Sequence, residues 1–178
     1  DAVVTAGAGI GGHTLQVNKL ASSAQHGYSY TADATNAGQI SFNYKSDVGD
    51  PSKKVTIAIA AGATPTDIAT SINANDKAPV YAAVVKEGAT ERLVFSSRKT
   101  GQNADFDVDL TGLASGASMG ELATYKRNTG LNADVLIDGV APTTPPESNV
   151  IENAIPGVRL TLKGVTTSPT SASTIAAT

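Results

Sequence analysis

The segment Ile151–Gly164, with the sequence IENAIPGVRLTLKG, carries the clearest structural pattern in this chain. Its Pro156–Gly157 dipeptide is typical of a tight turn. The residues that follow, Val158–Lys163, alternate between apolar and polar types, which predicts a strand with one buried and one solvated face. The segment therefore predicts a strand, a turn at Pro156 and Gly157, and a second strand. It offers no nucleophile, no pair of metal ligands and no phosphate-binding loop.

The same alternation recurs along the chain and predicts further strands. They cover residues 13–20, 39–45, 55–60, 80–84, 93–97, 104–110 and 132–137. The last of these ends at Asp138 and Gly139, a dipeptide that favours a tight turn, so Gly139 joins Pro156 and Gly157 as a predicted structural turn. The polar segment 21–38 predicts only a weak strand or an extended connection.

One segment has a strong helix pattern. Thr64 can cap a helix, Pro65 suits the first helical position, and Asp67 completes a capping box with Thr64. Ile68 and Ile72 lie one turn apart and share a face. We expect a helix of about three turns that packs its two isoleucines against a sheet.

A second capping-box pattern, Ser118 with Glu121, predicts a short helix at most, because Gly120 lowers the helix propensity by about 1 kcal/mol relative to Ala. Strands therefore dominate, and they do not alternate regularly with helices. The predicted fold class is α+β, predominantly antiparallel β. Residues 166–178 lack an apolar period and are expected to be poorly ordered at their end.

The composition excludes several classes of function. Only 16% of the residues are charged and the formal net charge is −3, so the clustered Lys and Arg of nucleic-acid binding proteins are missing. No run approaches the roughly 20 apolar residues of a membrane span. The chain has no cysteine, which leaves neither disulfides nor thiol chemistry. We therefore expect no nucleic-acid partner and no membrane partner.

Three glycines, Gly7, Gly9 and Gly12, match the dinucleotide-binding pattern GxGxxG. This pattern binds a cofactor only where the glycines open a helix whose N-terminus receives the phosphates. The strand-like segment 13–20 follows here instead, so we interpret the match as a coincidence and expect no cofactor. A cofactor enzyme that uses this loop stays a remote alternative.

The acidic and histidine side chains offer little chemistry. Asp105, Asp107 and Asp109 share one face of a predicted strand, and a solvated polar face is favoured over a weak divalent-cation site because the Gly and Glu of a calcium loop are missing. His13 and His26 have no metal-ligand partner at useful spacing, so each is interpreted as a surface imidazole. We predict that the chain is not an enzyme and has no catalytic, cofactor-binding or metal site.

The segment 132–163 resembles the flagellar hook-associated protein 2 family, the filament cap proteins. In that family a strand ending in D-G-V precedes a polar loop and an N-x-I-x-x-A-I-P-G-V-x-L-T-L-K run. Here Asp138–Val140, Asn149, Ile151 and residues 154–163 stand at those positions.

Two further segments carry the resemblance. Residues 15–25 are similar to the family's strand with V-x-x-L-A near its start. Residues 55–107 resemble the insert unit of flagellins and hook-associated proteins, with D-I-A-x-x-I-N at Asp67–Asn73, L-V-F-S-S at Leu93–Ser97 and T-G at Thr100–Gly101.

The resemblance implies two small head domains, the second inserted into the first. Residues 1–37 and 126–178 would form the base domain, and residues 38–125 the inserted outer domain. Family members also have long helical, heptad-bearing segments at both termini, which build the leg of the cap. This chain has no such segments and therefore looks like an excised head region.

The resemblance further implies a structural and assembly function, outside the cell at the tip of the bacterial flagellum. There a cap oligomer promotes flagellin polymerisation, so self-association and flagellin are the expected partners, and in some bacteria such caps also contact host mucin or surface glycans. The alternative from another class is an extracellular adhesin domain that binds carbohydrate or a host surface.

Overall fold

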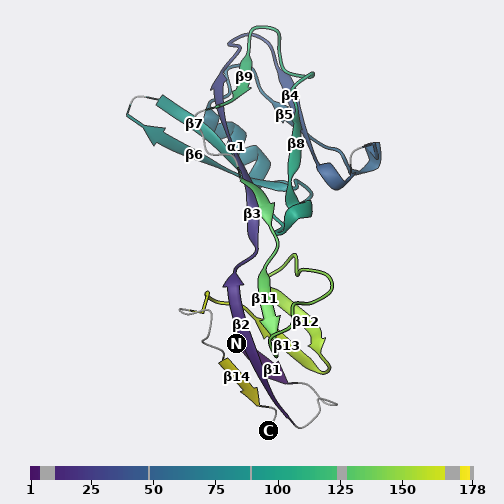
Figure 1. Ribbon diagram of the computed structural model, residues 1–178. Coiled ribbons are helices and arrows are strands. Elements are labelled where there is room, and N and C mark those ends of the chain that lie inside the picture. The colour runs from purple at the N-terminus through teal and green to yellow at the C-terminus, as the bar shows by residue number, and fades with distance from the viewer. Residues whose placement is uncertain (5–10, 48, 89, 124–127, 167–172, 177–178) are drawn as a thin grey trace. The chain divides into compact units, whose positions relative to one another are not determined.

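The computed structural model describes residues 1–4, 11–47, 49–88, 90–123, 128–166 and 173–176 (Figure 1). The contacts within the chain divide it into two compact units. The first unit consists of Asp1–Ser22, Thr100–Gln102 and Gly130–Thr178, and the second of Ser23–Lys99 and Asn103–Thr129. No helix among the described residues is long and apolar enough to cross a membrane.

The described residues of the first unit form two antiparallel sheets of three strands each. One has the order β1–β13–β12, with the bounds Ala2–Val4, Val158–Thr161 and Val150–Ile155. The other has the order β11–β2–β14, with the bounds Asp134–Ile137, Gly12–Lys19 and Ser173–Ala176. Within the tail, Ser173–Ala176 pair with β2 as β14, while residues 167–172 and 177–178, on which the expectation of poor order also falls, lie outside the described residues.

Aliphatic side chains form the core of the first unit. The buried residues are Val17, Ala21, Ala133, Val135, Ile151, Ile155, Val158, Leu160 and Leu162. Along β13, Val158 and Leu160 are buried while Arg159 between them is exposed. The alternation predicted from the sequence is therefore confirmed at this strand.

The described residues of the second unit form most of a five-stranded sheet, a three-stranded sheet and one α-helix. In the larger sheet the order is β10–β3–β7–β6 and β9 also pairs with β3; the bounds are Asn128–Leu131, Ser22–Thr31, Thr90–Ser97, Val80–Glu87 and Ser118–Glu121. The smaller sheet has the order β5–β4–β8, with the bounds Val55–Ile59, Gly38–Tyr44 and Phe106–Asp109. Short 3₁₀ helices η1, η2 and η3 cover Lys45–Asp47, Pro51–Lys53 and Gln102–Ala104.

The predicted helix is confirmed as α1, Pro65–Asn73. The Thr64 hydroxyl accepts a hydrogen bond from the Asp67 N–H at 3.2 Å, and the Asp67 carboxylate accepts one from the Thr64 N–H at 2.9 Å. Ile68 and Ile72 are buried in the core of the second unit, and the helix packs against β6. The capping box and the apolar face therefore both act as the sequence indicated.

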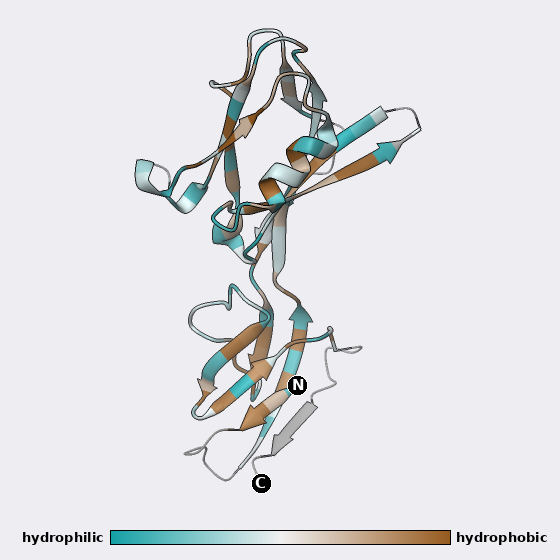
Figure 2. Cartoon of the chain, turned by 180° about the vertical axis from the view of Figure 1, so that it is seen from behind, coloured by the Kyte–Doolittle hydropathy of each residue, from teal (hydrophilic) through white to brown (hydrophobic). Residues whose placement is uncertain are grey.

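Aromatic side chains fill the core of the second unit. Phe42, Phe95 and Phe106 are completely buried. The rings of Phe42 and Phe95 meet edge to face, with centroids 5.2 Å apart. In Figure 2 the brown apolar residues alternate with teal and white ones along the strands, as expected for strands with one buried face. The predicted class, α+β with mostly antiparallel sheet, is confirmed.

Two segments differ from the sequence-based prediction. Residues 22–31 form the long strand β3 rather than a weak strand or connection, and Ala24, His26 and Tyr28 occupy its buried face. Ser118–Glu121 forms β9 rather than a short helix. Its Met119 is buried in the core opposite Tyr30 of β3, and this pairing overrides the local helix signal.

The contact units also bear on the predicted domains. The second unit is inserted in the sequence of the first, and segment 23–37 belongs to the second unit, whereas the sequence-based division placed it in the base domain. The physical reason is the pairing of β3 with β7 and β9. The limits of independently folding domains stay a prediction.

Candidate functional site: turns and side-chain bridges of the motif segments

The turn at Gly139 depends on two residues with positive φ, Asp138 and Gly139 itself. Gly139 has φ +78° and Asp138 has φ +51°, a conformation that favours Gly and tolerates Asp. The Asp138 carboxylate accepts a hydrogen bond from the Thr14 N–H at 2.8 Å, and its other oxygen lies 2.7 Å from Nδ1 of His13. These hydrogen bonds lower the pKa of the Asp138 carboxyl, and the one from His13 has the largest effect. The His13 ring is partly exposed, in agreement with the interpretation as a surface imidazole, and it has an acidic partner that the sequence did not indicate.

The turn at Pro156 and Gly157 joins β12 to β13. Gly157 has φ +74°, which glycine adopts without steric cost. Before the turn the register of β12 shifts between Glu152 and Ile155, and Asn153 takes φ +59°. This bulge bends the strand where the apolar residues of the motif turn inward. The structure thus places Gly139, Pro156 and Gly157 in turns of the first unit, and the effect of replacing them stays a prediction.

Asn149 joins two distant segments of the first unit. Its side-chain Nδ2 donates to Ala21 O at 2.9 Å, and its Oδ1 accepts from the Ala21 N–H at 2.7 Å. Its own carbonyl accepts from the Leu162 N–H at 2.7 Å. One asparagine thus satisfies both backbone groups of a buried alanine and holds the end of the β13 segment, which accounts for the N that opens the N-x-I run.

Asn73 performs the same task in the second unit. At the end of α1, its Nδ2 donates to Ala82 O at 2.8 Å and its Oδ1 accepts from the Ala82 N–H at 2.9 Å. The side-chain amide thereby replaces a neighbouring strand at one position of β6. This accounts for the N that closes the D-I-A-x-x-I-N helix.

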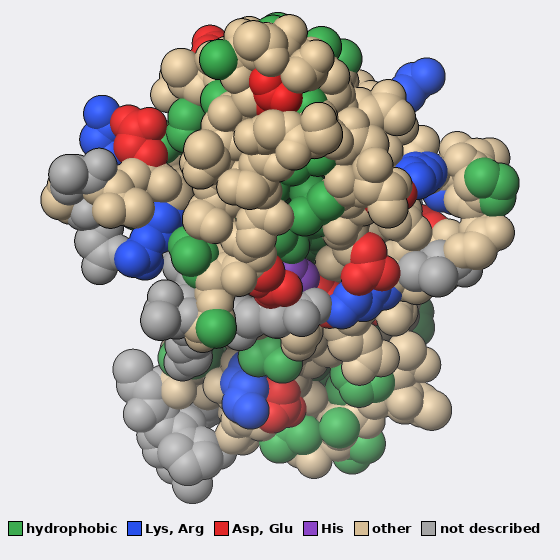
Figure 3. Space-filling view, turned by 90° about the horizontal axis from the view of Figure 1, so that it is seen from above, with side chains coloured by type: hydrophobic (Ala, Val, Ile, Leu, Met, Phe, Trp, Pro, Cys, Tyr) green, Lys and Arg blue, Asp and Glu red, His purple; other side chains and the backbone are tan. Residues whose placement is uncertain are grey.

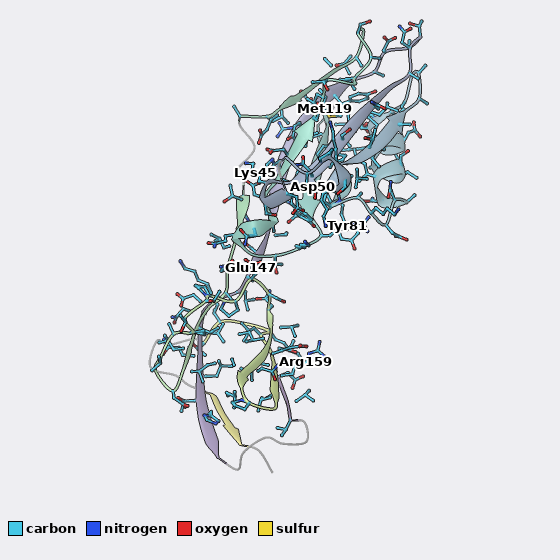
Figure 4. The ribbon with its side chains drawn as sticks, turned by 90° about the vertical axis from the view of Figure 1, so that its right-hand side faces the viewer. Lys45, Asp50, Tyr81, Met119, Glu147 and Arg159 are labelled. Atoms are coloured by element: carbon cyan, nitrogen blue, oxygen red, sulfur yellow. The ribbon has the colours of Figure 1, made fainter. Side chains whose placement is uncertain are left out.

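The T-G pair of the resemblance also has a structural explanation. Gly101 has φ +98°, and a Cβ atom built there would lie 2.6 Å from Cβ of Glu147. Thr100 Oγ1 donates to the Glu147 carbonyl at 2.6 Å. Only glycine fits this position without displacing the loop that contains Glu147, which Figure 4 labels.

A buried ionic cluster lies where the sequence predicted solvated groups. His26 is 2% exposed, its Nε2 lies 2.9 Å from Asp105 Oδ1, and its Nδ1 lies 3.5 Å from Glu121 Oε1. Lys45 Nζ donates to the other oxygen of Asp105 at 2.7 Å. The ring of His26 also stacks on Phe106. The interpretation of His26 as a surface imidazole is therefore wrong.

The cluster perturbs the acidity of its carboxylate. Burial by itself raises the pKa of Asp105, but hydrogen bonds from Lys45 and His26 outweigh it and hold the pKa below its ordinary value. The cluster therefore behaves as a satisfied ionic network inside the second unit. The alternation of Ala24, His26 and Tyr28 is the sequence signal that could have revealed His26 as an inward residue.

The three aspartates near β8 have separate roles. Asp105 precedes the strand and is buried, Asp107 is exposed, and Asp109 pairs with Lys54. Hydrogen bonds from Lys54 and Thr111 lower the pKa of Asp109. The predicted solvated face holds for Asp107 and fails for Asp105. Within the described residues, no group of three or more His, Cys, Asp or Glu side chains is arranged to hold a metal ion.

Neither of two surface hollows gathers reactive groups. One, of about 230 Å³ in the first unit, is lined mainly by apolar residues such as Leu131, Pro142 and Pro146. The other, of about 280 Å³ in the second unit, is lined by Asn43, Gly49, Asp50, Pro51, Lys54 and Asp109. Neither lining contains a Ser, Thr, Cys or His side chain. On the face in Figure 3, charged side chains form small groups within a mostly uncharged surface.

Of the glycines in the GxGxxG match, Gly7 and Gly9 lie outside the described residues. Gly12 begins the strand β2, as the alternation predicted. The third glycine therefore does not open a helix, and the geometry of a dinucleotide site is missing at this residue.

Comparisons with known proteins agree with these motifs. The family described as "Flagellin hook IN motif" matches residues 39–99. The B-type flagellar hook-associated protein 2 of Pseudomonas aeruginosa is 29% identical over 182 residues, a match that covers 93% of this chain and 38% of that protein. The chain thus spans well under half the length of this curated relative.

Solved structures share the fold. The crystal structure of FliD (HAP2) from Pseudomonas aeruginosa PAO1 has a TM-score of 0.71 and 25% identity, covering 100% of this chain and 83% of that chain. The D2-D3 domains of the flagellar cap protein from Serratia marcescens have a TM-score of 0.72 and 20% identity, covering 100% of this chain and 98% of that chain. Over nearly its whole length the chain is therefore similar to the head domains of the flagellar hook-associated protein 2 family, and the resemblance predicted from its motifs is confirmed.

Proposed function

We propose that this chain forms the head of a flagellar cap protein and serves as structural scaffolding at the tip of the filament, outside the cell. The observation that carries the proposal is the similarity to a hook-associated protein 2 over 93% of the chain. The site geometry agrees with a structural role, because the motif residues form turns, a helix cap and hydrogen bonds from side-chain amides to the backbone.

In this role the head contributes shape and strand edges to a cap that promotes the polymerisation of flagellin. Its partners are other copies of the cap protein and flagellin. The chain carries out no enzymatic reaction in this proposal. The adhesin alternative, with host mucin or surface glycans as ligands, has no feature among the described residues that favours it.

The test is genetic. In the bacterium that carries the gene, residues 1–178 are deleted from the cap protein, and filament length is measured by electron microscopy together with swimming. We expect short or missing filaments and unpolymerised flagellin in the medium. A matched control carries Asp107→Asn, a change at an exposed side chain, and keeps normal filaments. Normal filaments in the deletion strain would refute the proposal.

A further inference from the structure

The outer edge of β6 is closed over only part of its length. β6 ends the five-stranded sheet, and within the described part of the chain it pairs with β7 alone. Asn73 occupies the outward backbone groups of Ala82 with two hydrogen bonds. Arg98 Nε donates to Val80 O at 3.3 Å. Side chains of the same unit therefore cover the first half of this edge.

Beyond Ala82 the edge is open. Ala82 directs its N–H and C=O toward Asn73, away from β7, and the alternation of an antiparallel ladder makes Val84 and Lys86 direct theirs the same way. The described residues supply no backbone partner for Val84 and Lys86 on this side. An open strand edge of this kind favours pairing with another strand.

Exposed apolar side chains lie on the same strand. The exposed large apolar residues among the described part of the second unit are Tyr81 and Val85, at 54% and 45%. They lie on the face of β6 opposite to Val80 and Ala82, which are buried (Figure 4 labels Tyr81). The Arg98 guanidinium stacks over the Tyr81 ring at 4.3 Å, so Val85 is the less covered of the two.

We propose that the open part of β6, residues 83–87, pairs antiparallel with the same segment of a second copy, about a twofold axis at Val85. In this register Val84 of each copy forms a hydrogen-bonded pair with Lys86 of the other, and the two Val85 side chains face each other directly. The register leaves Ala82 and its bridge to Asn73 untouched. It also places Lys86 opposite Val84, so that no like charges meet.

The occupant is a second copy because the open segment is complementary to itself in this register. Such a contact closes on two copies and cannot by itself extend into a ring or a filament. The paired segments are short compared with a standard interface of about 1,600 Å², so the contact is expected to be weak and to form at high protein concentration. The inference does not depend on the proposed function.

The test uses the chain of residues 1–178, which contains no cysteine. Val85→Cys places two thiols opposite each other in a non-hydrogen-bonded pair, where the Cα atoms lie about 4.5 Å apart, close enough for a disulfide. The matched control is Ala83→Cys on the same exposed face. In the proposed register, residue 83 of one chain would lie about 13 Å along the paired strands from residue 83 of the other, which is too far for a disulfide.

Under mild oxidation we expect at least tenfold more disulfide-linked dimer from V85C than from A83C. Equal linking of the two variants, or none from V85C, would overturn the proposal. Amide hydrogen exchange of the unmodified chain supplies a second measurement. Val84 and Lys86 should exchange more slowly as the protein concentration rises, while Ala82 does not change, and Val85→Lys should abolish this dependence without altering the circular dichroism. Exchange rates of Val84 and Lys86 that do not depend on concentration would also overturn it.

Discussion

The two units differ in what fills their cores. The described Tyr residues and the three Phe of the chain belong to the second unit, whereas the core of the first unit, within its described residues, is aliphatic. An aromatic side chain buries about 150–250 Å², more than Val or Ala can. The second unit can therefore draw much of its stability from a few large side chains, whereas the first depends more on its sheets, turns and close approaches.

The units nevertheless share one device. Asn73 in the second unit and Asn149 in the first each satisfy both backbone groups of a single alanine. The comparison teaches that one side-chain amide can satisfy both the N–H and the C=O of a backbone position, in a strand as at Ala82 or between two strands as at Ala21. The following predictions test how far the two units differ, from the largest expected effect to the smallest.

The largest effect is expected from the aromatic core. Phe42→Ala should lower the free energy of unfolding of the second unit by about 3–5 kcal/mol, because it leaves a cavity beside the Phe95 ring in a completely buried part of the core. Tyrosine near-UV circular dichroism during urea unfolding reports this unit, since the described Tyr residues lie in it. Phe42→Leu, which keeps most of the volume, serves as the control and should cost clearly less. Equal losses for both variants would contradict the cavity explanation.

In the first unit, the second-largest loss of stability is expected from replacing Gly101. Gly101→Ala should lower the free energy of unfolding by about 2–4 kcal/mol, since it adds both backbone strain and a clash with Glu147. Gly139→Ala is the matched control in the same unit, because its φ is +78° but no atom lies within 4 Å of the added Cβ. The control should lose only about 1 kcal/mol, the strain alone. Far-UV circular dichroism during urea unfolding measures both; a larger loss for Gly139→Ala would refute the steric argument.

The shared bridges should give similar, smaller effects. Asn149→Ala and Asn73→Ala should each cost about 1–3 kcal/mol in their own unit, because each leaves an alanine N–H and C=O without its partner. Hydrogen exchange of Ala21 and Ala82 locates the change at the bridge. Asn18→Ala, at an exposed side chain in β2, is the control and should stay within about 0.5 kcal/mol of the parent. Unchanged exchange at Ala21 in Asn149→Ala would show that the bridge is not formed.

Acid should destabilise the second unit through the His26 cluster. The pKa of Asp105 is lower in the folded state than the ordinary value of 3.8, so its ionised form stabilises the fold above that pH. This contribution is lost as the pH falls below 3.8 toward the folded pKa. Asp105→Asn should therefore flatten the loss of thermal stability between neutral and acidic pH. A pH profile of Asp105→Asn identical to that of the parent would argue against the cluster.

Local patterns predicted much of the fold. The helix α1 and the strand β13 were predicted because their caps, turns and apolar periods all indicate the same structure. β3 was underestimated because its inward positions are Ala24, His26 and Tyr28, which do not form a clearly apolar series. β9 was mistaken for a helix because its conformation depends on pairing with β3, a contact distant in sequence that no local pattern encodes.

The candidate site shows the same limit. Turn glycines such as Gly139 and Gly157 could be predicted, since short dipeptides determine tight turns. The partners of Asn149 and His26 could not, because Ala21 and Asp105 are brought to them only by the assembled sheets.

The central claim is that the chain consists of two structural units with unlike cores. The most direct test is hydrogen exchange on the Phe42→Ala and Leu160→Ala variants of residues 1–178. Amides of both units are followed in each variant. We predict that Phe42→Ala speeds global exchange in the second unit only, and that Leu160→Ala speeds it in the first unit only. Equal acceleration in both units by either variant would show one cooperative body and contradict the account.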